Sequence, residues 1–211
     1  MNNSINYYKN KIAYVFLKES DEYIYIYDIP TKNWNYVWNE LKLTDDYTFN
    51  ALWDKNDNLY FDSWGLVLDE NKQIASPREH YHNTYKYTLD DKSLHLYLDN
   101  YNIHSSSRDL ENILLKKRSI HDEYYIYNLE QEKFVHEFEA DIYHICWSND
   151  GKYVAYYSDS SDSICIYSLA SNKTYEQKID YLNDTRYLVE LSPEDDYFIF
   201  FIQGENSKGD L

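Results

Sequence analysis

The stretch ICWSNDGKYVAYYSDSSDSICIYSLASNKTYEQKI, which covers residues 145–179, contains four short apolar runs separated by polar turns. The runs alternate between apolar and polar residues or are rich in β-branched and aromatic residues, which predicts β-strands. The segments between them contain Asn, Asp, Ser and one Gly, which favour tight turns. The stretch therefore predicts four successive strands joined by hairpins, and the rest of the chain shows whether this unit is repeated.

The third run of this stretch recurs twice elsewhere in the chain. SICIYSLASNK at residues 163–173 has counterparts in EYYIYNLEQEK at 123–133 and EYIYIYDIPTK at 22–32. The shared positions hold isoleucine, tyrosine and a further aliphatic residue: Ile26, Ile126, Ile166, Tyr27, Tyr127, Tyr167, Ile29, Leu129 and Leu169. Each copy then enters a polar turn and a further short run, so the unit is repeated.

The first two runs of the opening stretch are repeated as well. YHICWSNDGKYVAYY at 143–157 is similar to FNALWDKNDNLYF at 49–61 and YLVELSPEDDYFIFF at 187–201, and a weaker copy, YKYTLDDKSLHLYL, starts at Tyr85. The polar tetrads inside these copies contain Asp and Asn, which bond their own backbone in hairpin turns. A four-stranded unit that recurs about every 40 residues has the length of a β-propeller blade, ~40–45 residues.

The repeat resembles those of the WD-repeat and related β-propeller families. SNDGKYVA at 148–155 is similar to the first hairpin of their blades, and Ile-Tyr-Asp at 26–28 lies where those repeats carry a Trp-Asp pair. Asn128 and Ser168 replace the aspartate in the other copies, and the sequence contains no Gly-His dipeptide. The chain therefore shares the general pattern of these families and departs from their signature dipeptides.

The resemblance implies an all-β fold, a propeller of four to five four-stranded blades that forms a single domain over residues 1–211. The expected blades cover residues 4–38, 46–76, 84–138, 141–179 and 186–202, and the last holds only two strands. An open antiparallel stack is the alternative, but its unpaired edge would favour aggregation.

The third expected blade is longer than the usual repeat and contains the segment SSSRDLENILLKKRS. Ser106 or Ser107 is placed to cap a helix, and apolar residues recur at helical spacing from Leu110 to Leu114. Cations at the end of the segment favour a helix C-terminus. The pattern therefore predicts a short helical insertion near residues 106–118.

The chain is strongly acidic, with a formal net charge of −17. Such a surface repels nucleic acid and anionic lipid, so we expect no direct nucleic-acid or membrane partner. The N-terminal sequence lacks a signal-peptide pattern, and no apolar run approaches the ~20 residues that span a bilayer. Two cysteines without a disulfide framework fit a reducing compartment, so a cytoplasmic location is expected.

Two groups of residues are candidates for binding a partner. The aromatic group is Trp34, Tyr36, Trp38 and Trp64. The basic group is Arg108, Lys116, Lys117 and Arg118, the cations of the expected helical insertion. The alternatives are that the aromatic residues form the core between blades and that the cations are only solvated.

His80 and His82 are the candidates for a metal or ligand site, because alternate residues of a strand share one face. Glu79, His104 or His121 would have to supply a third ligand, and no spacing selects among them. Two histidines fall short of the ligand sets that hold zinc, so no metal and no other cofactor is expected.

The sequence contains no motif of a nucleophile elbow or a Gly-rich phosphate loop. The SNDGK turn has the glycine of a calcium loop but no closing glutamate at the right distance. Cys146 and Cys165 are expected on the first and third strands of one blade, beyond disulfide reach. Both thiols are therefore expected to be buried and inert.

The first functional hypothesis is a non-enzymatic β-propeller that binds another protein; the sequence does not indicate its oligomeric state. A more specific alternative is an acidic inhibitor or immunity-type protein that blocks a basic partner such as a nuclease. The third hypothesis is an enzyme or ligand binder with a channel site near His80 and His82.

Overall fold

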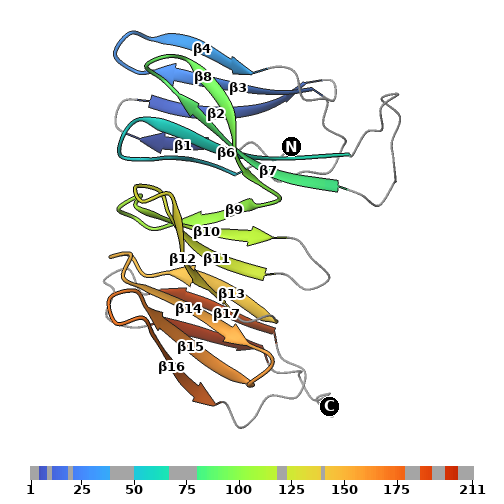
Figure 1. Cartoon of the computed structure of the whole chain (residues 1–211), viewed down its shortest axis with the longest axis vertical. Helices are drawn as coiled ribbons and strands as arrows, with labels where there is room; N and C mark the ends of the chain where they lie inside the picture. Colours follow the sequence, from blue (N-terminus) through green and yellow to red (C-terminus); the bar gives the residue numbers. More distant parts are fainter. Residues whose placement is uncertain are drawn as a thin grey trace, which may run out of the picture. The chain divides into compact units, whose positions relative to one another are not determined.

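The computed structural model describes residues 5–8, 11–18, 21–38, 50–66, 80–117, 123–138, 141–178, 186–191 and 198–203 (Figure 1). These residues form 18 β-strands and, within the same ranges, no helix. The protein is therefore of the all-β class, as the repeat predicted. None of the described segments is a helix long and apolar enough to cross a membrane.

Four sheets share one plan, in which four strands that follow each other in the sequence also lie next to each other in order (Figure 1). The first sheet consists of β1 (Ile5–Tyr8), β2 (Lys11–Lys18), β3 (Asp21–Asp28) and β4 (Asn33–Trp38). The second consists of β5 (Ala51–Trp53), β6 (Asn58–Leu66), β7 (His80–Thr88) and β8 (Ser93–Asp99). The third consists of β9 (Asn102–Ser106), β10 (Asn112–Lys117), β11 (Glu123–Asn128) and β12 (Lys133–Glu137). The fourth consists of β13 (Ile142–Trp147), β14 (Tyr153–Ser158), β15 (Ser163–Ser168) and β16 (Lys173–Lys178). A two-stranded sheet pairs β17 (Arg186–Leu191) with β18 (Phe198–Gln203).

The strand order corrects the limits of two expected blades. The second sheet covers residues 51–99 and the third covers 102–137, so the predicted limits 46–76 and 84–138 are wrong. The error arose because β6 and β7 are separated in the sequence by residues 67–79, which made β7 look like the start of a new blade. A single domain over residues 1–211 stays a prediction.

The chain comprises two compact units, Met1–His104 with Leu115–Arg118 and Ser105–Leu114 with Ser119–Leu211. In the first unit, β1 lies beside β5. One cluster of buried side chains joins the first two sheets: Ala13, Ile26, Ala51, Trp53, Leu59, Phe61 and Tyr87. The core of this unit therefore lies between the sheets, where their apolar faces meet.

In the second unit, β13 lies beside β17. Its buried cluster draws on the third and fourth sheets: Leu114, Tyr124, Ile126, Phe138, Ile142, Ile145, Val154, Tyr156, Cys165 and Tyr167. Burying one large apolar side chain stabilises a fold by about 1.5–3 kcal/mol, so packing between neighbouring sheets is the main source of stability. The repeated apolar positions of the sequence supply these faces.

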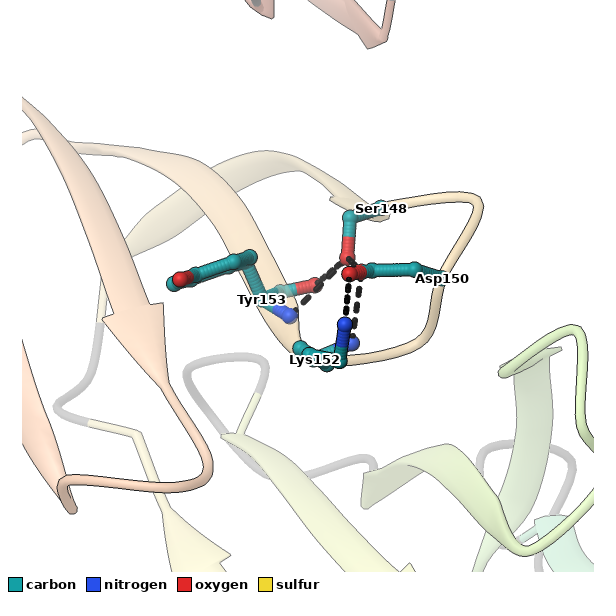
Figure 2. Close-up of polar contacts among 4 residues, drawn as sticks. All are labelled: Ser148, Asp150, Lys152 and Tyr153. Carbon is teal, nitrogen blue, oxygen red and sulfur yellow. Dashed lines mark hydrogen bonds and ion pairs between the residues drawn. The ribbon is translucent and has the colours of Figure 1, made fainter. Parts of the chain in front are cut away.

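The hairpin between β13 and β14 is held by polar side chains (Figure 2). Ser148 Oγ accepts a hydrogen bond from the N–H of Tyr153 (2.9 Å), and Asp150 Oδ1 accepts one from the N–H of Lys152 (3.0 Å). The Lys152 ammonium donates to Asp150 Oδ2 (2.7 Å) and is the main reason why the pKa of Asp150 lies below its usual value. The SNDGK segment is therefore a hairpin turn, as its Asp and Asn content predicted.

The segment expected to be a helix near residues 106–118 is the equivalent hairpin, between β9 and β10, so that prediction was wrong. Ser107 Oγ accepts the N–H of Asn112 (3.0 Å), and Asp109 Oδ1 accepts the N–H of Glu111 (3.0 Å). Leu110 has a φ of +60°, close to the +69° of Gly151 in the β13–β14 turn. Ser and Asp bond nearby backbone N–H groups in turns as well as at helix starts, so the capping signal was ambiguous.

The hairpin between the third and fourth strands has one backbone feature in all four sheets. The residue before the fourth strand has a positive φ, between +48° and +56°: Lys32, Lys92, Glu132 and Asn172. In the first sheet, Asp28 Oδ1 accepts hydrogen bonds from the N–H (2.9 Å) and the hydroxyl (2.7 Å) of Thr31, and these two bonds hold the pKa of Asp28 below its usual value. A non-glycine residue in this left-handed region is disfavoured by about 1–2 kcal/mol.

We expect Gly151→Ala to lower the free energy of unfolding by about 1–2 kcal/mol. The added Cβ would lie 3.1 Å from Ser107 Cβ and would sit on a backbone with a φ of +69°. Gly151→Asn is the matched variant, because Asn adds the same Cβ but tolerates a positive φ. Urea unfolding of the three proteins measures the effect; equal stability of all three would contradict the close approach of the two hairpins.

Candidate protein-binding surface

Among the aromatic candidates, the structure places Trp34 at the surface. Its side chain, on β4, is 57% exposed. Tyr36 and Trp38 lie further along β4, and Trp64 lies on β6; the structure describes only the backbone of these three residues. Trp34 is thus not part of the core between the sheets.

The indole ring of Trp34 is held by two tyrosines of the neighbouring strand. Trp34 lies opposite Tyr27 in the antiparallel pair of β3 and β4, and their ring centroids are 4.8 Å apart with a tilt of 42°. The ring of Tyr25 meets that of Trp34 edge-on, at 6.1 Å and 89°. An aromatic side chain that is fixed on one side and exposed on the other is typical of an interface anchor.

The third sheet repeats this arrangement one hundred positions later in the sequence. Phe134 on β12 is 44% exposed and lies opposite Tyr127 of β11. Its ring centroid lies 5.1 Å from that of Tyr127 and 5.5 Å from that of Tyr125. Sequence reasoning had not selected Phe134, although the repeat that aligns Tyr27 with Tyr127 would have found it.

The last strands of all four sheets expose a large apolar side chain: Trp34 on β4, Leu96 on β8, Phe134 on β12 and Tyr175 on β16. A single exposed apolar residue is common on protein surfaces. Its recurrence on the last strand of each four-stranded sheet is a systematic feature of the repeat.

The basic candidates that the structure describes do not lie on the expected helical insertion. Arg108 lies exposed in the turn between β9 and β10, and Lys116 and Lys117 are half-buried on β10. Arg118 lies outside the described residues. The hairpin therefore replaces the helical docking element that the sequence predicted.

His80 and His82 both lie on β7, two positions apart, so their backbone positions share one face of the second sheet. His82 is buried, and the side chain of His80 is not described. His104 is exposed, whereas Glu79 and His121 lie outside the described residues. In the part of the chain that the structure describes, no three His, Cys, Asp or Glu side chains are grouped so as to hold a metal ion.

Cys146 and Cys165 lie on β13 and β15, with β14 between them, and they form no disulfide. Cys165 is buried in the core of the second unit, while Cys146 is partly exposed. The expected positions on the first and third strands are confirmed, and the expectation of burial is met only by Cys165.

A histidine joins the third and fourth sheets within the second unit. The ring of His136 on β12 stacks on Tyr167 of β15, with centroids 3.8 Å apart and an interplanar angle of 16°. Phe138 meets His136 edge-on at 4.6 Å. Burial lowers the pKa of His136, and the neighbouring Glu137 carboxylate opposes this effect. Burial thus favours the neutral form of His136 in its aromatic contact between the third and fourth sheets.

We expect the free energy of unfolding to decrease as the pH falls below about 6.5, the pKa of an unperturbed histidine. The folded pKa of His136 lies below the unfolded value, so the unfolded chain binds the proton first and protonation favours unfolding. His136→Phe keeps an aromatic ring without the charge. Urea unfolding between about pH 7.5 and 5.5 should therefore show a stability difference that grows in favour of the variant, whereas parallel curves would contradict this prediction.

Solved structures that resemble the chain are β-propellers. The β-propeller domain of the trilobed protease from Pyrococcus furiosus matches with a TM-score of 0.63 and 12% identity, over 99% of this chain and 64% of that one. TolB from Acinetobacter baumannii matches with a TM-score of 0.55 and 11% identity, over 95% and 54%. A chain of the mitotic checkpoint complex matches with a TM-score of 0.54 and 12% identity, over 94% and 57%. The protein therefore has the β-propeller fold that its repeat predicted.

The chain spans between 54% and 64% of the length of these three chains. At such low identity, the likeness shows the fold alone. No protein-family model matches the sequence, and no curated protein matches it.

The expectation that the protein is not an enzyme is corrected by these comparisons. The propeller domain with the TM-score of 0.63 belongs to a protease, and an oligogalacturonate lyase and an acylaminoacyl peptidase also match, at 9% and 13% identity. Propellers of this plan thus occur in enzymes, because a fold does not determine a function. The lack of a familiar catalytic motif in the sequence was no ground for excluding an enzymatic role.

Proposed function

We propose that the protein is a β-propeller module that binds another protein and that Trp34 is a main contact residue. The observation that carries this proposal is the 57% exposure of Trp34, combined with the fixed position of its ring on Tyr27. Tryptophan is one of the residues enriched at interface hot spots. The fold supports the proposal in general terms, because a chain of similar fold is part of the mitotic checkpoint complex.

The partner in this proposal is a basic protein. The net charge of −17 attracts a cationic surface over long range and raises the rate of encounter. An acidic inhibitor that blocks a basic partner, such as a nuclease, is a narrower form of the same proposal. The charge supports both forms, and identification of the partner distinguishes them.

Trp34→Ala is expected to weaken partner binding about tenfold or more, because truncation of a hot-spot residue commonly removes this much affinity. The partner is first captured from the lysate of the native host, identified by mass spectrometry, purified, and then titrated by calorimetry. Tyr143→Ala is the matched control, because Tyr143 is 50% exposed but lies on a first strand, β13. Equal losses of partner affinity for both variants, or no loss for either, would contradict the role of Trp34 as a contact residue.

The salt dependence of the same titration tests the charge of the partner. The range of electrostatic attraction shrinks from about 10 Å at 0.1 M salt to about 3 Å at 1 M. A basic partner should therefore bind more slowly and more weakly at high salt. If binding is unchanged over this range of salt concentration, the proposal of a protein-binding module stands, but the proposal of a basic partner is wrong.

A further inference from the structure

We propose that β4 binds an extended, cationic segment of the partner as an additional strand of the first sheet. This inference rests on the proposed function and names the mode of binding and the chemistry of the segment. β4 is the last strand of its sheet in the part of the chain that the structure describes (Figure 1). Alternate residues of a last strand direct their N–H and C=O groups away from the sheet, where an extended peptide can pair with them.

The first argument is the absence of charge on β4. Natural end strands are commonly protected against pairing by charged residues, especially lysine. β12 carries Lys133 and Glu137, and β16 carries Lys173, Glu176 and Lys178. β8 ends in Asp99. β4, with the sequence NWNYVW, is the one last strand of the four-stranded sheets that contains no Asp, Glu, Lys or Arg.

The second argument is the regular geometry of β4. Its pairing with β3 keeps one register from Asn33 to Tyr36, and the register shifts only beyond Tyr36. On β12 the corresponding shift falls directly after Phe134, because Phe134 lies opposite Tyr127 while His136 lies opposite Ile126. A bulge interrupts the row of backbone groups with which a new strand would pair. The regular row of β4 is therefore longer than that of β12 and equal to that of β8. The row of β16 is longer still, but it carries the charges of Lys173, Glu176 and Lys178.

The third argument identifies the chemistry of the bound segment. Between residues 21 and 38 the chain carries three carboxylates, Asp21, Glu22 and Asp28, against one cation, Lys32. The exposed indole of Trp34 attracts cations over its ring face, and tryptophan does so more strongly than tyrosine or phenylalanine. A second copy of this chain would bring another net charge of −17 to the same edge, which opposes self-pairing. An arginine- or lysine-bearing segment fits this edge better.

The test uses three synthetic heptapeptides on the full chain. The first alternates arginine and valine, the second has the same sequence with alternate backbone amides N-methylated, and the third has glutamate in place of arginine. We expect the arginine peptide to bind and to shift the NMR signals of the β4 amides. N-methylation should weaken binding at least tenfold without changing the charge, because it removes the donors of the new strand, and the glutamate peptide should not bind.

Two variants test the location of the binding site. Asn35→Lys adds a gatekeeper charge to β4, and Thr174→Lys adds the same charge to β16; both residues are exposed. We expect Asn35→Lys to weaken binding of the arginine peptide about tenfold and Thr174→Lys less than twofold. Equal weakening by both variants, or equal binding of the N-methylated peptide, would show attraction by charge alone and overturn the inference. Concentration-dependent dimerisation that Asn35→Lys abolishes would assign the edge to a second copy and would also overturn it.

These results are separable from the proposed function. If the natural partner binds the Asn35→Lys chain with unchanged affinity, the strand-addition site is wrong while protein binding stands. If no specific protein partner is captured from the native host, the proposed function fails, whereas the peptide titrations still measure the properties of the β4 edge.

Discussion

Trp53→Ala is expected to lower the free energy of unfolding by about 3–5 kcal/mol, the usual range for removing a large aromatic side chain from a core. Trp53 is 1% exposed, lies on β5 opposite Leu59 of β6, and belongs to the cluster that joins the first two sheets. Its removal would leave a cavity between sheets rather than within one sheet. The loss should therefore weaken the packing of the first sheet against the second.

Urea and thermal unfolding measure this effect, and Trp34→Ala is the matched control. The same substitution at a side chain that is 57% exposed should lower stability by about 1 kcal/mol at most, the value of its aromatic contacts. Trp53→Phe should have a smaller effect than Trp53→Ala, because it keeps a ring and removes an indole N–H that has no hydrogen-bond partner among the described residues. Similar losses for Trp53→Ala and Trp34→Ala would contradict the assignment of the core.

Asp54→Ala is expected to lower the free energy of unfolding by about 3 kcal/mol, because it leaves several buried donors without an acceptor. Asp54 is 4% exposed, although aspartate is rarely buried to this extent. Its Oδ1 accepts the N–H groups of Asn56 (2.8 Å) and Asn58 (2.9 Å). Its Oδ2 accepts the side-chain amide of Asn58 (2.8 Å) and the hydroxyl of Tyr60 (3.2 Å). One carboxylate thus closes the whole turn between β5 and β6.

Asp150→Ala is the control for this prediction. Asp150 also accepts a backbone N–H in a first hairpin, but it is exposed, so water replaces the lost acceptor and a loss of about 1 kcal/mol is expected. Asp54→Asn should lie between wild type and Asp54→Ala, since the amide keeps one acceptor oxygen. If Asp54→Ala and Asp150→Ala are equally stable, burial of the Asp54 network is not what holds the turn.

The strand content and the propeller class could be predicted because the same local pattern occurs several times. Ile26 and Ile126 occupy matching positions in the sequence, and both are buried in the clusters between sheets. Residues that recur at the same place in each repeat lie in the same structural environment. Agreement between copies was therefore stronger evidence for the fold than the pattern of any single strand. The limits of the second blade failed where this agreement was interrupted, at residues 67–79.

The helix prediction failed because single residues in this segment fit two structures. Leu110 and Leu114 have helical spacing, but Leu114 is buried in a strand, whereas Leu110 occupies the left-handed position of a turn. The alignment of Ser107 and Asp109 with Ser148 and Asp150 is the signal that identifies a hairpin turn. Local spacing gave the wrong answer where comparison between copies would have given the right one.

The candidate surface was only partly predictable. Trp34 could be selected by residue type, but its exposure depends on its position on the last strand of a sheet, which no local pattern reveals. The same sequence argument grouped Arg108 with Lys116 and Lys117 in one helical insertion, whereas the hairpin places Arg108 in a turn and the two lysines in a strand. Which residues lie at the surface depends on the order of the strands in each sheet, and this order is known only from the assembled fold.

The repeated left-handed turns have a practical consequence for engineering. Lys92 and Glu132 occupy equivalent positions of different sheets with φ values of +56° and +48°. Asparagine, which already occupies the fourth copy as Asn172, tolerates this conformation better than lysine or glutamate. Because effects at distant sites add, copying the residue of one repeat into the others would raise thermal tolerance in small, predictable increments. The residue found in one repeat thus indicates which substitution would stabilise the equivalent turn in the others.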